Sequence, residues 1–178
     1  MSAVNILIAG FGGQGILFAG KFLVYAGLLN GRQVSWLPSY GPEMRGGTAN
    51  CSVIIGDSPI GSPIVTNPDI LAVMNAPSMD RYEPACVRNA KVFVDSSLIS
   101  RKLDRDDLSA WYIPATEMAD KNGLNGLANM IMMGALLKET DICAYDDFGA
   151  ALGKAVPERK KDLYSSNLKA LSLGYEYN

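Results

Sequence analysis

The feature that most constrains the fold is a short apolar run followed at once by a glycine-rich turn and a long apolar stretch. Residues 4–9 (VNILIA) precede residues 10–15 (GFGGQG), and residues 16–29 are almost wholly apolar. This order predicts a buried strand, a tight turn and a buried helix. The glycines have the G-x-G-x-x-G spacing that lets a backbone approach a phosphate. Because a helix start attracts anions, the turn is either a phosphate site or a close-packing turn.

Apolar runs alternate with helical patterns through the first two-thirds of the chain. Further strands are expected at residues 33–37, 48–55, 69–75, 91–95 and 111–114, with a helix at about 78–88. The last third is expected to be helical, at residues 124–138, 147–155 and 158–171. Such alternation is typical of an α/β fold, in which a parallel or mixed sheet has helices on both faces in a three-layer, Rossmann-like arrangement. No shift in composition divides residues 1–178, so we expect one domain.

Composition excludes several functions. A net charge of -2 gives no basic footprint for nucleic acid, and the absence of histidine removes the commonest general base and metal ligand. Cys51, Cys86 and Cys143 are too far apart for a local zinc or iron–sulfur motif, so we expect free, buried thiols. The chain starts without a cationic secretory segment, and its longest apolar stretch is shorter than a membrane span. We therefore expect a cytoplasmic protein without a membrane anchor.

A dinucleotide site would also need an acidic residue at the end of the second strand, to hold a ribose. That strand runs into Pro38 and Ser39, and the next acid, Glu43, belongs to a different loop. This disfavours an enzyme that uses NAD or FAD. A kinase-type phosphate loop is excluded because no Lys-Ser or Lys-Thr pair follows the glycines.

The second unusual segment is residues 39–47 (SYGPEMRGG), which contains Arg45 followed by two glycines. Arginine binds carboxylates and phosphates through a two-pronged contact, and flanking glycines give a ligand room. Alternatively, Arg45 pairs with Glu43 as part of the protein's own structure. In a doubly wound sheet this loop and the glycine turn both follow carboxyl ends of strands, so we expect them to line one crevice.

The two glycine-rich segments carry a family resemblance. Residues 10–15 with Ala19-Gly20, followed by residues 40–47, closely resemble the gamma subunit of 2-oxoacid:ferredoxin oxidoreductases. Further similarities lie at Ser62-Pro63, at residues 68–71 and at residues 129–137, so the resemblance covers essentially the whole chain in order. It implies a multi-subunit enzyme that decarboxylates a 2-oxoacid on thiamine diphosphate. Electrons pass through [4Fe-4S] clusters to ferredoxin, and the acyl group passes to coenzyme A.

The resemblance also implies a division of labour. Thiamine diphosphate, magnesium and the clusters belong to other subunits, which are the expected partners, with ferredoxin an indirect one. This chain has no catalytic residue and no Gly-Asp-Gly run, is inactive alone, and contributes coenzyme A contacts and a subunit interface. Gly12, Gly13, Gln14 and Gly15 are the candidates for the coenzyme A phosphates, and Gln14 alternatively only closes the turn. Arg45 is a candidate for a coenzyme A phosphate, a substrate carboxylate or a neighbouring subunit.

The resemblance favours 2-oxoglutarate over a branched-chain 2-oxoacid as substrate. Three alternatives are a stand-alone phosphate- or nucleotide-binding sensor module, the gamma-like part of an indolepyruvate ferredoxin oxidoreductase, and the disfavoured NAD(P)-dependent reductase. Among weaker polar candidates, residues 95–97 (DSS) either meet a ligand or cap a helix. Asn125 and Asn129 share a face of one apolar helix, where they either satisfy buried backbone groups or line a subunit contact. The methionines at 130, 132 and 133 are expected to fill the core or an interface.

Overall fold

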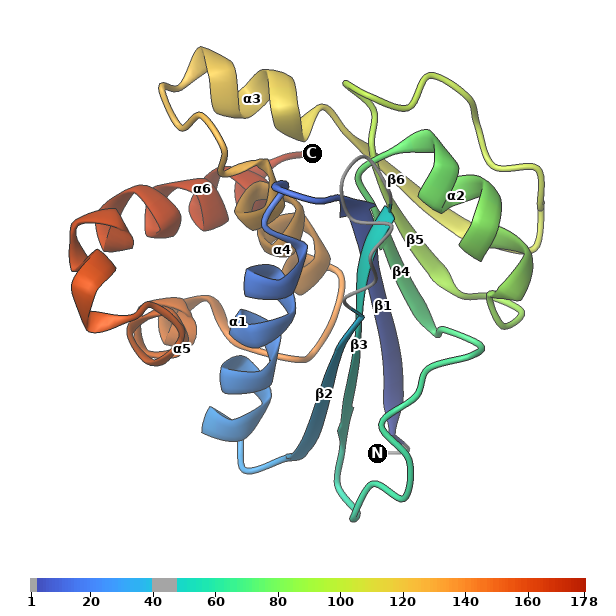
Figure 1. Cartoon of the computed structure of the whole chain (residues 1–178), viewed down its shortest axis with the longest axis horizontal. Coiled ribbons are helices and arrows are strands. Elements are labelled where there is room, and N and C mark those ends of the chain that lie inside the picture. The colour runs from blue at the N-terminus through green and yellow to red at the C-terminus, as the bar shows by residue number, and fades with distance from the viewer. Residues whose placement is uncertain (1–2, 40–47) are drawn as a thin grey trace.

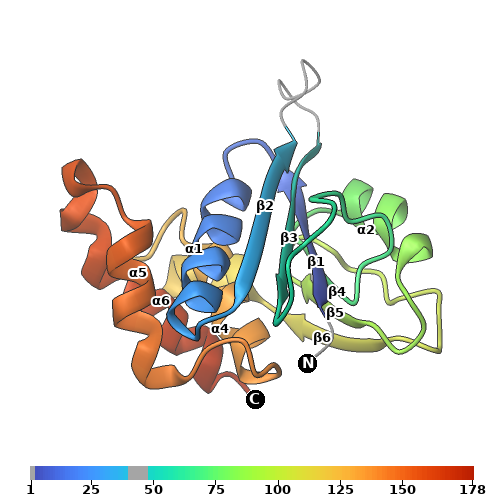
Figure 2. The same ribbon diagram turned by 90° about the horizontal axis from the view of Figure 1, so that it is seen from below.

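The computed structural model of the chain describes residues 3–39 and 48–178. Six of its strands form one mixed sheet in the order β2-β3-β1-β4-β5-β6 (Figure 1). Their bounds are β1 (Val4–Phe11), β2 (Gln33–Ser39), β3 (Thr48–Gly56), β4 (Ile70–Val73), β5 (Lys91–Asp95) and β6 (Ser109–Ile113). Strands β1, β4, β5 and β6 are parallel, whereas β3 is antiparallel to both of its neighbours, β1 and β2. The carboxyl ends of all strands except β3 therefore lie at one edge of the sheet (Figure 2).

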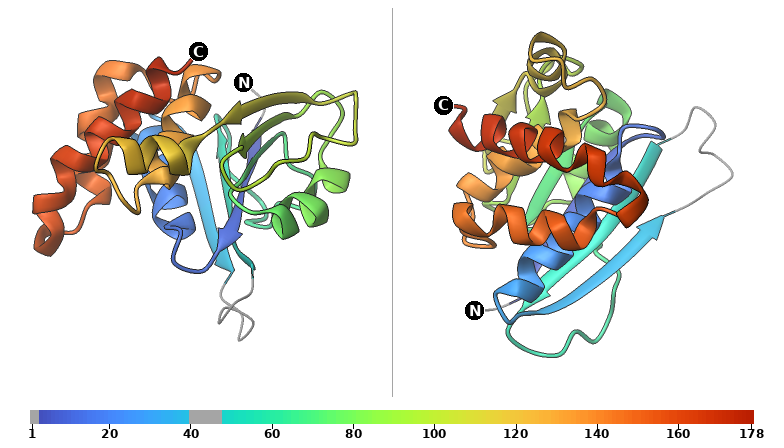
Figure 3. Two further views of the ribbon diagram at one scale, coloured as in Figure 1. Left: turned by 90° about the horizontal axis from the view of Figure 1, so that it is seen from above. Right: turned by 90° about the vertical axis from the view of Figure 1, so that its left-hand side faces the viewer.

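Helices cover both faces of the sheet, as expected. One face carries the long helix α1 and a group of helices from the last third of the chain; the other carries α2 and its short 3-10 extension (Figure 3). The bounds are α1 (Ile16–Leu29), α2 (Ala76–Tyr82) with Glu83–Ala85, α3 (Ala115–Lys121), α4 (Ala128–Lys138), α5 (Phe148–Ala155) and α6 (Tyr164–Glu176). Helix α5 packs on α1 and α6 packs on α4, which adds an outer helical layer.

The alternating strand pattern divides the interior into two apolar clusters. In β1, Ile6 and Ile8 join the cluster under α1 and α4, whereas Leu7 joins the cluster under α2. In β5, Phe93 faces the first cluster, and Val92 faces the second. Because both faces of these central strands are buried, they read as continuous apolar runs, which is why the sequence revealed them.

Helices α4 and α6 cross with their backbones in contact. A Cβ atom added to Gly134 would lie 2.0 Å from the carbonyl oxygen of Leu171, and one added to Gly174 would lie 1.8 Å from that of Ile131. Neither separation is compatible with a side chain at these positions. The two glycines therefore set the distance between α4 and α6.

A buried acid anchors the loop that follows β5. Glu83 is 2% exposed, and its Oε1 accepts hydrogen bonds from the backbone N–H groups of Asp104 and Arg105 at 2.5 and 3.1 Å. Its Oε2 lies 2.9 Å from Nη2 of Arg101, which also pairs with the exposed Asp80. The carboxylate thus holds a charged surface loop against the end of α2.

The structure corrects several details of the predicted elements. The helix expected at 158–171 is a 3-10 segment at Glu158–Leu163 followed by α6 at Tyr164–Glu176. The helix expected at 124–138 begins only at Ala128, because Gly126 has a positive φ of 81° just before it. Helix α3, at Ala115–Lys121, was not predicted, since its seven residues are too few to show a period. The antiparallel β3 was not specified either; residues 40–47 are too short a connection for the crossover that parallel pairing requires.

Candidate functional site

The glycine turn lies where the strand order reverses. From β1 the chain passes through α1 to β2 on one side, whereas β4 lies beside β1 on the other. In open α/β sheets, ligands bind in the crevice outside the carboxyl ends of the strands at such a switch point. The sequence placed the turn at a strand end, and the topology places it at this crevice.

The turn requires glycine at two of its positions. Gly13 and Gly15 have φ values of 95° and 73°, in the left-handed region that costs other residues energy. A Cβ on Gly15 would also lie 2.5 Å from Nδ2 of Asn129. Helix α1 begins directly after Gly15 without a side-chain cap and without an acidic residue in its first turn. The anion-attracting end of α1 is therefore not neutralised by side chains of this segment.

The side chain of Gln14 is used inside the protein. Its Oε1 accepts a hydrogen bond from the backbone N–H of Phe11 at 2.6 Å, and its Nε2 donates one to the carbonyl oxygen of Met74 at 3.0 Å. Phe11 ends β1, and Met74 directly follows β4, so the amide bridges the two strand tips. Of the two roles expected for this side chain, the structure shows the turn-closing one.

Asn129 holds the other side of the turn. Its Nδ2 donates a hydrogen bond to the carbonyl oxygen of Gly15 at 3.0 Å, and the residue is 3% exposed. Asn125, which was expected on the same helix face as Asn129, instead precedes α4 and is exposed. Sequence reasoning missed the contact between Asn129 and Gly15 because 114 residues separate them.

Two cavities flank the turn. One, of about 190 Å³, is lined by Gly13, Gln14, Met74 and Thr116, among others. The second, of about 230 Å³, is lined by Gly15, Phe18, Asn129, Lys160 and Asn167, among others. Gly126 lines both, so the cavities adjoin beneath the start of α4. The turn therefore borders concave surface on both sides.

The acid at the end of β5 has a structural role. Asp95 is fully buried, and its carboxylate accepts hydrogen bonds from the backbone N–H of Ser97 at 3.1 Å and from the Thr116 hydroxyl at 2.6 Å. A longer contact of 3.4 Å joins it to the backbone N–H of Thr116, near the start of α3. Of the two interpretations of residues 95–97, the structure thus shows the helix cap. The methionines at 130, 132 and 133 are buried in the core, as expected.

Arg45 and the rest of residues 40–47 lie outside the described residues, so the expected crevice between the two glycine-rich segments stays a prediction. The strands on either side are described. Ser39 ends β2, and the register pairs Phe11 of β1 with Thr48 of β3. Both ends of this segment therefore lie at the same sheet edge as the glycine turn.

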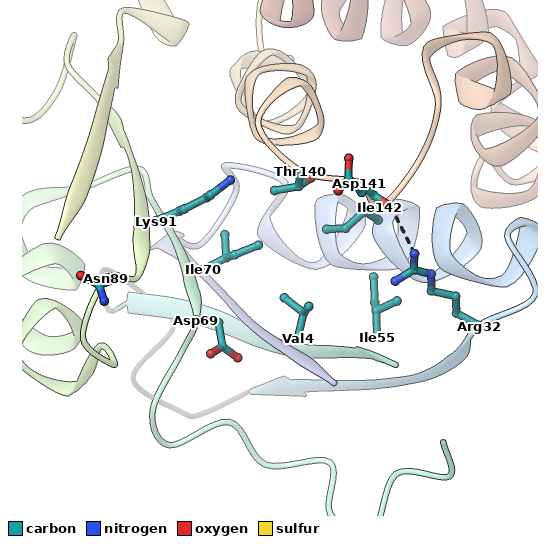
Figure 4. Close-up of a pocket in the computed structure, with 10 residues that line it drawn as sticks. All are labelled: Val4, Arg32, Ile55, Asp69, Ile70, Asn89, Lys91, Thr140, Asp141 and Ile142. Atoms are coloured by element: carbon teal, nitrogen blue, oxygen red, sulfur yellow. Dashed lines mark hydrogen bonds between the residues drawn. The ribbon is translucent and has the colours of Figure 1, made fainter. Parts of the chain in front are cut away.

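A cavity of about 240 Å³ lies at the opposite edge of the sheet (Figure 4). Its charged residues bond to neighbouring groups. Asp69 accepts hydrogen bonds from the backbone and side chain of Asn5 at 2.8 and 2.9 Å, and Lys91 donates one to the carbonyl oxygen of Glu139. Because this cavity lies at the amino ends of the parallel strands, away from the switch point, we place the candidate site at the glycine turn.

The thiols are not reactive groups of the site. All three cysteines are free and buried, as expected, and burial raises the pKa of the Cys51 thiol to about 12. Within residues 3–39 and 48–178, no three histidine, cysteine or acidic side chains gather closely enough to hold a metal ion. In the same part of the chain, no helix is long and apolar enough to cross a membrane.

Comparisons with known proteins bear on this geometry. The family model described as pyruvate ferredoxin/flavodoxin oxidoreductase matches residues 5–177. The 2-oxoglutarate synthase subunit KorC of Methanocaldococcus jannaschii is 37% identical over 97% of this chain and 92% of its own length. The ketoisovalerate oxidoreductase subunit VorA of Methanothermobacter thermautotrophicus is 36% identical over 98% of this chain, which spans 36% of that relative's length.

A solved structure has the same fold. The gamma subunit of a keto/oxoacid ferredoxin oxidoreductase from Geobacter sulfurreducens PCA aligns with a TM-score of 0.83 and 27% identity. The alignment covers 97% of this chain and 96% of that one. The α/β fold with a mixed sheet and a helical last third is thereby confirmed.

Proposed function

Because the chain belongs to the pyruvate ferredoxin/flavodoxin oxidoreductase family, we propose that it is the gamma subunit of a 2-oxoacid:ferredoxin oxidoreductase. In the assembled enzyme a 2-oxoacid is oxidatively decarboxylated, its acyl group passes to coenzyme A, and ferredoxin is reduced. This chain contributes coenzyme A contacts and a subunit interface. The observation that carries the proposal is the uncapped start of α1, which lies at the switch point between two cavities.

The phosphates of coenzyme A are proposed to lie against the backbone of Gly12, Gly13, Gln14 and Gly15. Gly12 and Gly13 are exposed, and the start of α1 favours negative charge there. The bound amide of Gln14 gives its side chain a positioning role, so contact with the ligand falls to the backbone. Arg45 is proposed as a further contact to a phosphate, a substrate carboxylate or a neighbouring subunit.

Thiamine diphosphate, magnesium and the [4Fe-4S] clusters are assigned to partner subunits. Among the described residues, no three histidine, cysteine or acidic side chains gather closely enough to hold magnesium or a cluster. On this proposal the groups held by the partner subunits carry out the oxidation. We expect the isolated chain to be inactive. In the cell, we propose that the chain acts in the cytoplasm as part of a heteromeric complex.

For the substrate we propose 2-oxoglutarate, with a branched-chain 2-oxoacid as the second candidate. The similarity to KorC supports the first, and the similarity to VorA supports the second. Their identities to this chain, 37% and 36%, do not separate the two.

The test is to co-express the chain with the subunits encoded beside it, purify the complex and follow ferredoxin reduction. We expect reduction that depends on coenzyme A and is fastest with 2-oxoglutarate, and none from the isolated chain. Faster reduction with 2-oxoisovalerate or with indolepyruvate would assign the chain to the enzyme of that substrate. Turnover by the isolated chain, or a failure to co-purify with any thiamine-diphosphate-binding subunit, would refute the proposal and favour the sensor module.

A matched pair of variants tests the phosphate site. Gln14→Glu introduces a carboxylate at the start of α1, and Gln14→Met loses the same hydrogen bond to Met74 without adding a charge. Two unit charges about 5 Å apart repel by roughly 3 kcal/mol at an effective dielectric constant of about 20. We therefore expect the KM for coenzyme A of Gln14→Glu to exceed that of Gln14→Met at least tenfold. Equal KM values for both variants would assign the turn to packing.

A further inference from the structure

Two asparagines that line the cavity beside Gly15 each have a buried amide oxygen without a hydrogen-bond donor among the described residues. Asn129 of α4 and Asn167 of α6 are each 3% exposed, and both line this cavity of about 230 Å³. Nδ2 of Asn129 donates to the carbonyl oxygen of Gly15 at 3.0 Å, and Nδ2 of Asn167 donates to that of Leu163 at 2.7 Å. Within the described part of the chain, neither Oδ1 accepts a hydrogen bond.

Rotating either amide by 180° would not supply a partner. It would turn Oδ1 toward a backbone carbonyl oxygen, so that two acceptors face each other and the existing hydrogen bond is lost. The orientation of both side chains is therefore fixed by their own backbone contacts. An unsatisfied buried acceptor carries a free-energy cost, and here α4 and α6 each contribute one such residue to the lining of the same cavity. A group that donates hydrogen bonds at this place would remove that cost.

The remaining lining restricts the kind of donor. Phe18, Leu127 and Val156 provide apolar walls, and among the described residues no aspartate or glutamate lines the cavity to pair with a charged amine. Lys160 is exposed and also lines it, and Gly15 connects it to the start of α1. The lining therefore suits a neutral N–H group inside the cavity, attached to an anionic group near Gly15 and Lys160.

We propose that this cavity is a subsite for a neutral N–H donor of a phosphate-bearing ligand, with Asn129 and Asn167 as its acceptors. The inference rests on the proposed function, in which that ligand is coenzyme A. Coenzyme A has two sources of such a donor, the amino group of adenine and the amides of the pantetheine arm. Asn167 is the residue to test, because it does not touch the glycine turn.

The experiment measures coenzyme A binding to the assembled complex by titration calorimetry. Asn167→Leu removes the acceptor, and Asn125→Leu makes the same change at an exposed position just before α4. Leu163→Trp fills the cavity from a side chain that is 41% exposed, should Asn167→Leu fail to assemble. We expect a five- to tenfold weaker Kd for Asn167→Leu and Leu163→Trp and an unchanged Kd for Asn125→Leu, since one hydrogen bond to a buried acceptor is lost.

Two analogues separate the sources of the donor. If the adenine amine is bound, Asn167→Leu and the wild-type complex will bind equally an analogue of coenzyme A whose purine lacks the 6-amino group. If a pantetheine amide is bound, Asn167→Leu will still weaken the binding of 4′-phosphopantetheine. Coenzyme A affinity that is unchanged in the assembled Asn167→Leu and Leu163→Trp complexes would overturn the subsite, because water alone would then serve the two oxygens. Failure of the wild-type complex to bind coenzyme A would instead overturn the proposed function.

Discussion

Replacing Gly134 with alanine should separate α4 from α6. The added Cβ would lie 2.0 Å from the carbonyl oxygen of Leu171, whereas a carbon and an oxygen normally stay about 3.3 Å apart. The helices would have to move apart by more than about 1 Å. A gap of 0.5–1 Å already removes a quarter to a half of the dispersion attraction between atoms, and the side chains at this crossing are buried.

Overpacking and helix propensity change the unfolding free energy of Gly134→Ala in opposite directions. Overpacking of a core costs about 3 kcal/mol at the upper end of its usual range, and alanine is favoured over glycine in a helix interior by about 1 kcal/mol. The net expectation for Gly134→Ala is a loss of about 2 kcal/mol in unfolding free energy. For a chain of this length that lowers Tm by roughly 4–8 °C.

The assay is urea and thermal unfolding followed by circular dichroism, with Gly153→Ala as the control. Gly153 is an exposed residue in α5, and the nearest atom to an added Cβ is Cε2 of Tyr164 at 3.9 Å, an ordinary contact. The control should therefore gain up to about 1 kcal/mol from helix propensity alone. A Gly134→Ala chain as stable as wild type would refute the backbone contact between α4 and α6.

Three further predictions follow from buried groups. At pH 8 the native thiols should resist iodoacetamide, because burial raises the pKa values of Cys86 and Cys143 to about 11 and leaves a thiolate fraction on the order of one in a thousand. Unfolding in urea should make the same thiols react. Labelling of the native chain at the rate of an ordinary exposed thiol would contradict this prediction. Since the unfolded chain releases these protons first, the unfolding free energy should also fall as pH rises from about 9 to 11, and replacing the cysteines with alanine should reduce that slope in a denaturation series. Glu83→Gln should lower the unfolding free energy by about 1–2 kcal/mol, measured in urea. This is less than for a fully buried ion pair, because the Arg101 side chain is 30% exposed and keeps its ion pair with Asp80. Asp80→Asn, at a side chain that is 65% exposed, should cost under about 0.5 kcal/mol, and equal costs for the two variants would argue against the buried anchor.

The sequence allowed prediction of the elements whose burial pattern is strong and local. Helix α1 was predicted with its observed bounds, Ile16–Leu29, because a glycine turn and an Asn-Gly pair enclose an almost wholly apolar run. Strand β5 was likewise predicted at residues 91–95. Helix α3 was not, because a seven-residue helix with two buried alanines leaves little period.

The candidate site was predictable in place but not in detail. The glycine spacing located the turn, since it depends on residues next to one another. The clamp from Asn129, the bridge from Gln14 to Met74 and the cavity shared with Asn167 depend on residues 60 to more than 110 positions away. The pairing of β1 with β4, and the packing of α4 on α1 and of α6 on α4, bring these groups together.

The bridge made by Gln14 limits how a ligand can lie on this fold. A dinucleotide straddles the switch point, with one half on each side of the reversal in strand order. Here a side-chain amide joins the tips of β1 and β4, and β3 moves β2 a further strand spacing of about 4.8 Å away from the turn. The Gln14 amide thus lies between the two strand tips, and the cavity of about 190 Å³ is found beside it. A ligand held at the turn would therefore lie in one of the two flanking cavities and not straddle the reversal in strand order.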